Sequence, residues 1–294
     1  MKKNRSSRTA EIVTAWRAAE SLQPEDDRIC NDELAGKLIH PVYQFIGAFD
    51  FLRKLGIWYS ERMAPGIPGF VIARTRYIDD HLQACIHEGL EQLVILGAGL
   101  DSRAYRFQSL ATTPVRVFEV DHPATQQVKI QRVLKAIGNI PEHVTYVPID
   151  FDRERLDQKL TATGYSHHKK TFFILEGVVT YLTAEAVDNT LAFVTQNSGP
   201  GSSIIMSYIF KSVIDDSQAK DKETRRFRKA VRKRGEPATF GIDEGAVETF
   251  LTSRGFTRIV NVSMSSLKER YFLHQNRYKR IFPRAGIAHA MVKS

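Results

Sequence analysis

Apolar runs of four or five residues alternate with amphipathic stretches along the chain from about residue 90 onward. Runs such as Phe172-Phe173-Ile174-Leu175 contain no polar position, which is typical of strands in a parallel sheet covered on both faces. Apolar residues at helical spacing separate most of these runs. The pattern predicts helices at 123–137, 184–196 and 243–254, and strands at 93–97, 115–120, 144–149, 171–175, 203–207, 258–263 and 287–292. This alternation is typical of an α/β fold with a Rossmann-like, doubly wound, mostly parallel seven-stranded sheet.

The first 89 residues have a helical pattern instead. Apolar residues recur at helical spacing from 41 through 63, and a loop rich in proline and glycine follows them. A further helix, from about 70 to 88, leads into the first predicted strand. We therefore expect an N-terminal helical cap with its lead-in helix at 1–89 and a core at 90–294, with a basic helical insertion near 211–242.

A short glycine turn follows the first predicted strand. Gly97 and Gly99 allow a ligand to approach the backbone closely, although such turns also occur for purely structural reasons. Ser102 stands where the dinucleotide-binding fingerprint has its third glycine, and Asp101 places a carboxylate where a pyrophosphate would bind. S-adenosylmethionine (SAM) has no phosphate and carries a sulfonium and an ammonium group, so the turn is compatible with SAM.

Acidic residues follow the next three strands. Asp121, 22 residues after Gly99, can accept hydrogen bonds from both hydroxyls of a ribose, although taken alone it is more typical of a cap for the following helix. Asp150 can accept from an adenine amine while Phe151 covers the ring, and Glu176 follows the fourth strand. Because parallel strands end at the same edge of a sheet, the acids together predict one nucleoside-binding site.

Three segments resemble motifs of the leucine carboxyl methyltransferase-like family, and smaller ones resemble its bacterial branch. The three are Leu96-Gly97-Ala98-Gly99-Leu100-Asp101-Ser102-Arg103-Ala104-Tyr105-Arg106, Phe118-Glu119-Val120-Asp121-His122-Pro123 and Leu175-Glu176-Gly177-Val178-Val179-Thr180-Tyr181-Leu182. The similarity covers roughly residues 8–292. One departure is Ser102, where threonine is commoner in the family.

The resemblance implies a class I methyltransferase fold with SAM as the cofactor, and it assigns roles residue by residue. The glycine turn would contact SAM, Asp121 would bind the ribose, and Asp150 with Phe151 would hold the adenine. The implied cofactor-binding residues are Arg74, Gly97, Gly99, Asp121, Asp150, Phe151 and Glu176. Of these, Arg74 would pair with the methionyl carboxylate, and Glu176 would face the amino end and the methyl-transfer region.

Arg74 also has support from its predicted position. We place it in the first turn of a helix, where a cation opposes the helix dipole by a few tenths to about 1 kcal/mol. A residue in a locally unfavourable place often has another role, which here would be bidentate binding of a carboxylate. An exposed arginine is the alternative interpretation.

The nucleophile decides which residues take part in the reaction. A carboxylate is ionised at neutral pH and needs no base, whereas a phenol or an alcohol requires one, usually a histidine. His122 could lie near the cofactor but is more typical of a surface histidine at a helix start. Glu176 and Tyr181 are the candidate catalytic residues, and a packed core tyrosine is an equally good interpretation of Tyr181.

The net charge of +9 is concentrated in one segment. Residues 220–234 contain nine lysines or arginines and two acids, a local charge of +7, which leaves +2 for the rest of the chain. This distribution favours a solvated helix surface, or a lid that attracts an acidic acceptor, over nucleic-acid binding. Cys30 and Cys85 have no metal-ligand spacing, and neither a signal peptide nor a membrane span is recognisable. We expect a cytoplasmic protein that binds no metal, no nucleic acid and no membrane.

The expected function is SAM-dependent O-methylation of a carboxylate or hydroxyl on a small molecule or peptide. Two other functions stay open at this point, a nicotinamide-dependent oxidoreductase and a catalytically inactive binding module with a methyltransferase fold. Ser102 and the lack of a Tyr-x-x-x-Lys pair after a strand argue against the first. The second is disfavoured because a decayed site usually loses charged groups such as Asp121 and Glu176.

Overall fold

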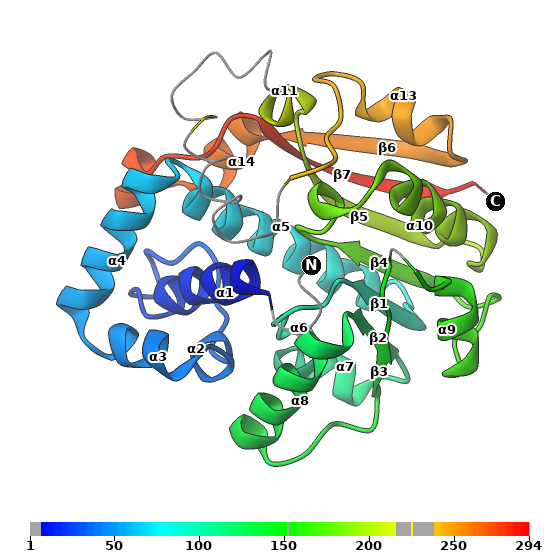
Figure 1. Cartoon of the computed structure of the whole chain (residues 1–294), viewed down its shortest axis with the longest axis horizontal. Coiled ribbons are helices and arrows are strands. Elements are labelled where there is room, and N and C mark those ends of the chain that lie inside the picture. Colours follow the sequence, from blue (N-terminus) through cyan, green and yellow to red (C-terminus); the bar gives the residue numbers. More distant parts are fainter. Residues whose placement is uncertain (1–6, 152, 216–224, 226–237, 294) are drawn as a thin grey trace.

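The computed structural model describes residues 7–151, 153–215, 225 and 238–293, and its centre is one seven-stranded sheet (Figure 1). The strand order is β3-β2-β1-β4-β5-β7-β6. The first five strands pair in parallel, and β7 runs antiparallel to both β5 and β6. The doubly wound, mostly parallel sheet predicted from the sequence is therefore confirmed. Its strands are β1 (Gln92–Leu96), β2 (Arg116–Asp121), β3 (Val144–Pro148), β4 (Thr171–Leu175), β5 (Ser203–Ile209), β6 (Phe256–Ser263) and β7 (Ala285–Val292).

The continuous apolar runs form the strands in the middle of this sheet. Every residue of β1, β4 and β5 is buried, whereas β6, at the edge, has several exposed positions. Strand β5 continues two residues beyond its predicted end because Tyr208 and Ile209 pair with Gly286 and Ala285 of β7. A partner far along the chain thus sets this boundary.

Helices cover both faces of the sheet. Apolar residues of α5 (Ile67–His87), α7 (Gln108–Thr112) and α14 (Met264–Tyr271) join one core cluster with β1 and β4. Residues of α9 (Leu156–Ala162), α10 (Ala184–Gln196) and α13 (Val247–Thr252) join the other. The remaining elements after β1 are α6 (Arg103–Arg106), α8 (Pro123–Ile137), η1 (Val179–Tyr181), α11 (Lys211–Ile214) and η2 (His274–Tyr278).

Two predicted helices have different bounds in the structure. The helix predicted at 243–254 is confined to α13, because Gly245 has a φ of +80°, which a helix does not continue through. The helical pattern over 41–63 forms two helices, α3 (Pro41–Ala48) and α4 (Asp50–Met63), since Phe49 is extended between them. The helical spacing predicted over 41–63 is therefore confirmed, and the break at Phe49 is a finding of the structure.

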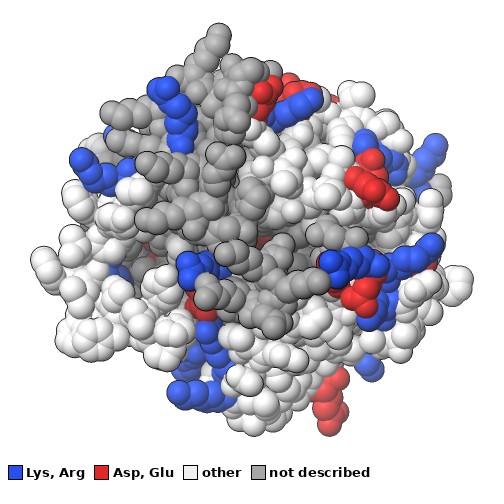
Figure 2. All heavy atoms as spheres, viewed as in Figure 1, with Lys and Arg blue, Asp and Glu red and all other residues white. Residues whose placement is uncertain are grey.

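The N-terminal helices pack loosely beside the sheet. α1 (Arg8–Ser21) lies between the sheet and the pair formed by α3 and α4 (Figure 1). The short helix α2 (Ala35–Leu38) contacts both α1 and α3. A cavity of about 860 Å³ separates α1 from α3 and α4. Large apolar side chains of the pair are exposed, and Figure 2 shows mainly uncharged atoms at this side of the molecule. They are Val42, Phe45, Phe49, Phe51, Leu55, Trp58, Tyr59 and Met63.

The predicted basic insertion near 211–242 lies largely outside the described residues. Its described part consists of α11, Arg225 and the segment from 238 onward. No helix in the described ranges has both the length and the apolar content needed to span a bilayer.

Candidate functional site

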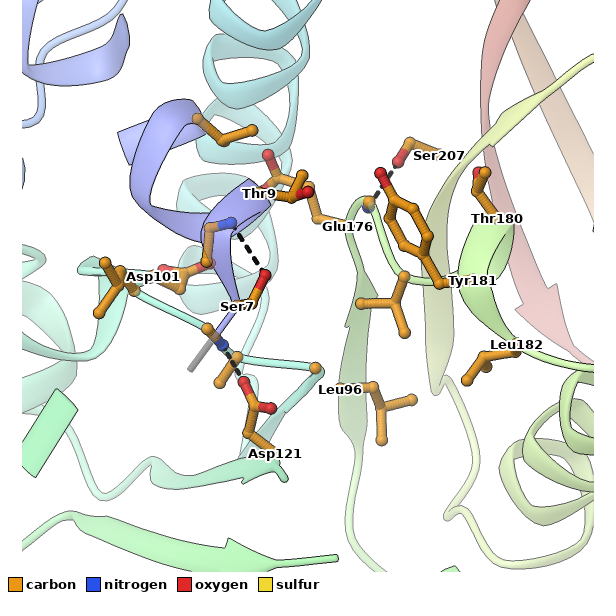
Figure 3. Close-up of a pocket in the computed structure, with 18 of the residues that line it drawn as sticks. Ser7, Thr9, Leu96, Asp101, Asp121, Glu176, Thr180, Tyr181, Leu182 and Ser207 are labelled. Carbon is orange, nitrogen blue, oxygen red and sulfur yellow. Dashed lines mark hydrogen bonds between the residues drawn. The ribbon is translucent and has the colours of Figure 1, made fainter. Parts of the chain in front are cut away.

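A pocket of about 530 Å³ opens at the carboxyl ends of β1, β2, β4 and β5. In Figure 3, Ser7 and Thr9 of the α1 region lie on one side of it, with Tyr181 and Leu182 on the other. All residues predicted as cofactor-binding or catalytic line this pocket: Arg74, Gly97, Gly99, Asp121, Asp150, Phe151, Glu176 and Tyr181. Residues spread over 108 positions of sequence are thus brought to one edge of the sheet.

The glycine turn has a backbone that other residues rarely adopt. Gly97 has a φ of +67° and Gly99 a φ of +47°. A Cβ atom on Gly97 would lie 2.2 Å from Cγ2 of Val178, so the residue has to be glycine for packing as well as for conformation. The amides of Gly97 and Ala98 both donate to the Val120 carbonyl, at 2.7 and 2.9 Å, which fixes the turn against β2.

Asp121 is held at the pocket wall by two backbone amides. Its Oδ2 accepts from the Gly99 amide, and its Oδ1 accepts from the His122 amide at 2.5 Å. Burial raises the pKa of Asp121, and the two hydrogen bonds offset this in part. The cap of α8 is His122, whose Nδ1 accepts from Ala124 at 3.2 Å. The alternative in which Asp121 caps this helix is therefore wrong.

Arg74 and Glu176, which are 102 residues apart in the sequence, form an ion pair. Arg74 Nε donates to Glu176 Oε1 at 2.8 Å, and Arg74 Nη1 lies 3.4 Å from Ser207 Oγ. Arg74 is only 6% exposed, so the exposed-arginine interpretation is wrong. The helix-dipole argument is also wrong, because α5 begins at Ile67 and Arg74 therefore lies beyond its first turn.

A second arginine, Arg103, connects Glu176 to two further carboxylates. Its Nη1 donates to Glu176 Oε2 at 2.6 Å and to Asp101 Oδ2 at 2.5 Å, and its Nε donates to Asp79 Oδ1 at 2.7 Å. Burial alone would raise the pKa of Glu176, but Arg103 and Arg74 together hold it below its usual range. Asp101 behaves in the same way, with Arg103 and Arg17 as the lowering groups. Both acids are therefore ionised at neutral pH.

The side of the pocket predicted to hold adenine has more exposed side chains. Asp150 Oδ2 lies 3.8 Å from Nε of the exposed Arg153, and its amide donates to Glu154 at 2.9 Å. Phe151 is half-buried and packs against the core beside α9. Tyr181 belongs to η1, where it is half-buried and faces the pocket, so it is not a fully packed core residue.

Sequence reasoning missed the residues that attach α1 to this site. Arg17 donates to the Leu100 carbonyl at 2.7 Å and pairs with Asp32 at 3.2 Å. Asp32 in turn accepts from Ser102 at 2.6 Å. Arg17 begins the segment Arg17-Ala18-Ala19-Glu20, one of the smaller segments that resemble the bacterial branch of the family. Nothing in the local pattern indicated a partner 83 residues away.

Comparisons with known proteins agree with this arrangement. A model of the leucine carboxyl methyltransferase family matches residues 10–195. The chain is 28% identical to YktD of Bacillus subtilis strain 168, a proposed SAM-dependent methyltransferase, over the full length of both proteins. It is 30% identical to a protein of Mycobacterium sp. strain JLS with the same description, over 89% of this chain and 87% of that one. A solved structure from Thermobifida fusca YX, described as that of a proposed methyltransferase, superimposes with a TM-score of 0.61 at 12% identity. This match covers 98% of this chain and 96% of the other, and it shows a common fold.

Proposed function

The chain belongs to the leucine carboxyl methyltransferase family of SAM-dependent methyltransferases, and we propose that it methylates a carboxylate oxygen of a small-molecule or peptide acceptor. SAM supplies an electrophilic methyl group on a sulfonium. The chain itself binds and orients the two reactants and excludes water. The acceptor is expected to be acidic, because its own carboxylate is the nucleophile.

The chemistry of the pocket fits SAM better than a dinucleotide. A pyrophosphate needs the exposed N-terminus of a helix, but the helix after the glycine turn, α6, has only four residues and Asp101 precedes it. The carboxylates of Asp101 and Glu176 suit a ligand that carries positive charge. Asp121 keeps a free lone pair on each oxygen for a ribose hydroxyl, in addition to its two backbone hydrogen bonds.

The Arg74–Glu176 pair matches the zwitterionic amino-acid end of SAM. Glu176 can accept from an ammonium group and Arg74 can donate to a carboxylate, so the ligand exchanges one buried ion pair for two. This exchange keeps every buried charge paired, which is the condition under which buried charges are tolerated. Asp150 and Phe151 are the proposed adenine contacts, at the other end of the pocket.

The single observation that supports a carboxylate acceptor is that the acids and the histidine in the described lining of the pocket are engaged by other groups, Asp121 by two backbone amides among them. Asp101 and Glu176 are paired with arginines that lower their pKa, so they are poor proton acceptors. The lining histidine in the described ranges is His122, and its Nδ1 is used to cap α8. An acceptor that is already ionised needs no base.

The acceptor end of the pocket is walled by apolar side chains. Ile67, Phe70 and Val71 of α5 line the pocket, as does Leu182 after η1. A carboxylate that attacks a sulfonium loses its charge as the reaction proceeds, so a water-poor environment favours the transition state over the separated ions. Tyr181 lines the pocket, and the catalytic role we propose for it is to orient the acceptor with its hydroxyl.

The test is transfer of labelled methyl from SAM to a panel of carboxylic acids, matched alcohols and phenols, and peptides with a free C-terminus. A methyl ester releases labelled methanol in mild alkali, whereas a methyl ether retains its label. We expect alkali-labile product, and Tyr181→Phe should lower the rate of transfer without changing SAM affinity. Label that survives alkali would overturn the carboxylate assignment in favour of a hydroxyl acceptor.

A further inference from the structure

We propose that Arg103 is a positioning residue that holds Asp101 and Glu176 together as one doubly charged receptor for the ammonium group of the methyl donor. The inference rests on the proposed function, because it concerns the same cofactor pocket. Arg103 does not line that pocket, whereas both carboxylates do.

The geometry of Arg103 is that of a clamp. One nitrogen, Nη1, donates to both carboxylates, at 2.5 Å to Asp101 Oδ2 and 2.6 Å to Glu176 Oε2. These acids follow β1 and β4, two neighbouring strands, so Arg103 ties together the two strand ends that flank the centre of the pocket. The Arg103 amide adds a bond to Asp101 Oδ1 at 2.8 Å, which leaves this carboxylate little freedom to rotate.

Arg103 is itself held in place by hydrogen bonds to α5. Its side chain is fully buried, its Nε donates to Asp79 of α5 at 2.7 Å, and its Nη2 donates to the Thr75 carbonyl at 3.4 Å. Both oxygens of Asp79 in turn accept from Nη2 of Arg106, at 2.7 and 2.6 Å. A planar guanidinium with several fixed donors can satisfy these acceptors at once, whereas a lysine ammonium cannot reproduce the fork.

Arg103 differs from Arg74 in what ligand binding does to it. Arg74 lines the pocket, so it can leave Glu176 to bind a ligand carboxylate. Arg103 has no access to the ligand, and its bond to Glu176 Oε2 persists while Oε1 becomes available. Glu176 therefore stays in place, and its charge stays close to that of Asp101, when Arg74 changes partner.

Asp101 and Glu176 both accept from Nη1 of Arg103. Without the Arg103 side chain, these two neighbouring carboxylates would come to share a proton. The repulsion between two neighbouring negative charges raises the pKa of one of the two carboxyl groups. The charged groups that act on the two carboxylates from the surrounding elements are Arg17 of α1, Arg74 of α5, Glu119 of β2 and Lys129 of α8. Asp79 of α5 and Arg106 of α6 pair with each other behind Arg103. Removal of Arg103 leaves these groups in place but takes away the only described cation that contacts both acids.

The experiment is calorimetric titration of SAM, from about pH 8 to about pH 5.5, into wild type, Arg103→Met, Arg103→Lys and Asp79→Asn. We expect Arg103→Met to bind SAM at least roughly tenfold more weakly at pH 8. It should lose further affinity as the pH falls, because a proton shared by the two carboxyl groups removes negative charge that attracts the ammonium group. Wild type should keep its affinity over this range. Arg103→Lys should show the same trend to a smaller degree, because it retains the charge without the fork.

Asp79→Asn is the matched control. It removes a charge from the same buried cluster and should lower the unfolding temperature as Arg103→Met does. Asparagine keeps the Oδ1 that accepts from Arg103 Nε, so Arg103 stays in place on the two carboxylates. It should therefore show no loss of SAM affinity at low pH. Adenosine, which lacks the amino-acid end, should bind all four proteins alike.

The outcomes separate the two ideas. If wild type binds adenosine but not SAM, the proposed function fails whatever Arg103 does. If SAM binds and the Arg103 variants keep the wild-type pH profile, or if Asp79→Asn loses affinity in acid just as they do, Arg103 is only structural. Should Arg103→Met not fold, Arg103→Lys decides, since a wild-type profile in that variant overturns the proposal.

Discussion

At the scale of single residues, the site depends on charges that are shared between partners. Glu176 accepts from Arg74 on one oxygen and from Arg103 on the other, so neither arginine alone accounts for its state. The two arginines differ in exposure to the pocket, and substitutions should therefore act differently at the two positions.

Arg74→Lys tests the carboxylate contact directly. Lysine keeps the charge opposite Glu176 but loses one of two parallel hydrogen bonds to a carboxylate, so we expect SAM affinity to fall roughly tenfold. Adenosine should bind as tightly as it does to wild type, because it has no carboxylate. Isothermal titration with both ligands makes the comparison, and equal SAM affinity in the two proteins would place the carboxylate elsewhere.

Residues whose surroundings are set by nearby sequence could be predicted, and those set by distant partners could not. Gly97, Asp121 and Glu176 each follow a strand directly, and the strand places them at the sheet edge. The partners of Arg103 lie 24 residues before it and 73 after it, so no local pattern indicates the cluster. The position of Arg74 was predicted for the wrong reason, because the start of α5 was misplaced by three residues.

At the scale of elements, the α3–α4 pair shows what periodicity leaves undetermined. Helical spacing of apolar residues predicts two helical segments correctly, but it does not say that this apolar face is exposed to solvent. The pair encloses a cavity with α1, and Gly47 of α3 and Gly56 of α4 both line it. Neither glycine has a positive φ, and a Cβ on either would have at least 4.0 Å of room.

Gly47→Ala and Gly56→Ala should therefore each raise the free energy of unfolding by roughly 1 kcal/mol, the helix propensity difference between the two residues. Gly69→Ala in α5 is the control, because its Cβ would lie 2.1 Å from the Arg280 carbonyl oxygen and should destabilise the protein. Denaturant titration measures all three. A loss of stability at Gly47 or Gly56 would mean that these helices need glycine for another reason.

At the scale of the whole molecule, α1 is the element that links the pocket to the N-terminal helices. Ala10, Val13 and Thr14 face the pocket, whereas Ile12, Ala15 and Ala19 face the cavity under α3 and α4. With open space on two sides, α1 depends in part on polar contacts such as the pair between Glu11 and Arg132 at 2.6 Å.

SAM should consequently stabilise α1 more than the sheet. At about a hundredfold excess over its dissociation constant, SAM should raise the free energy of unfolding by about 2.7 kcal/mol, with NADH giving no comparable change. Hydrogen exchange should slow in residues 8–21 beyond that global increase, since these amides open locally in the absence of ligand. Uniform slowing of the sheet and α1 would show that the helix is already fixed without SAM.

The attachment of α1 also has a consequence for how the chain acquires its pocket. Glu20 of α1 accepts from Lys279, 259 residues further on, and Asp27 just beyond α1 accepts from Asn276. Contacts of such long sequence separation form late, because the entropy of closing a long loop has to be overcome first. Helix α1 thus leaves the ribosome well before residues 276–279, which anchor it. A nascent chain can assemble most of the sheet before the wall of its cofactor pocket is in place, and the wall closes only after these anchoring residues have been made.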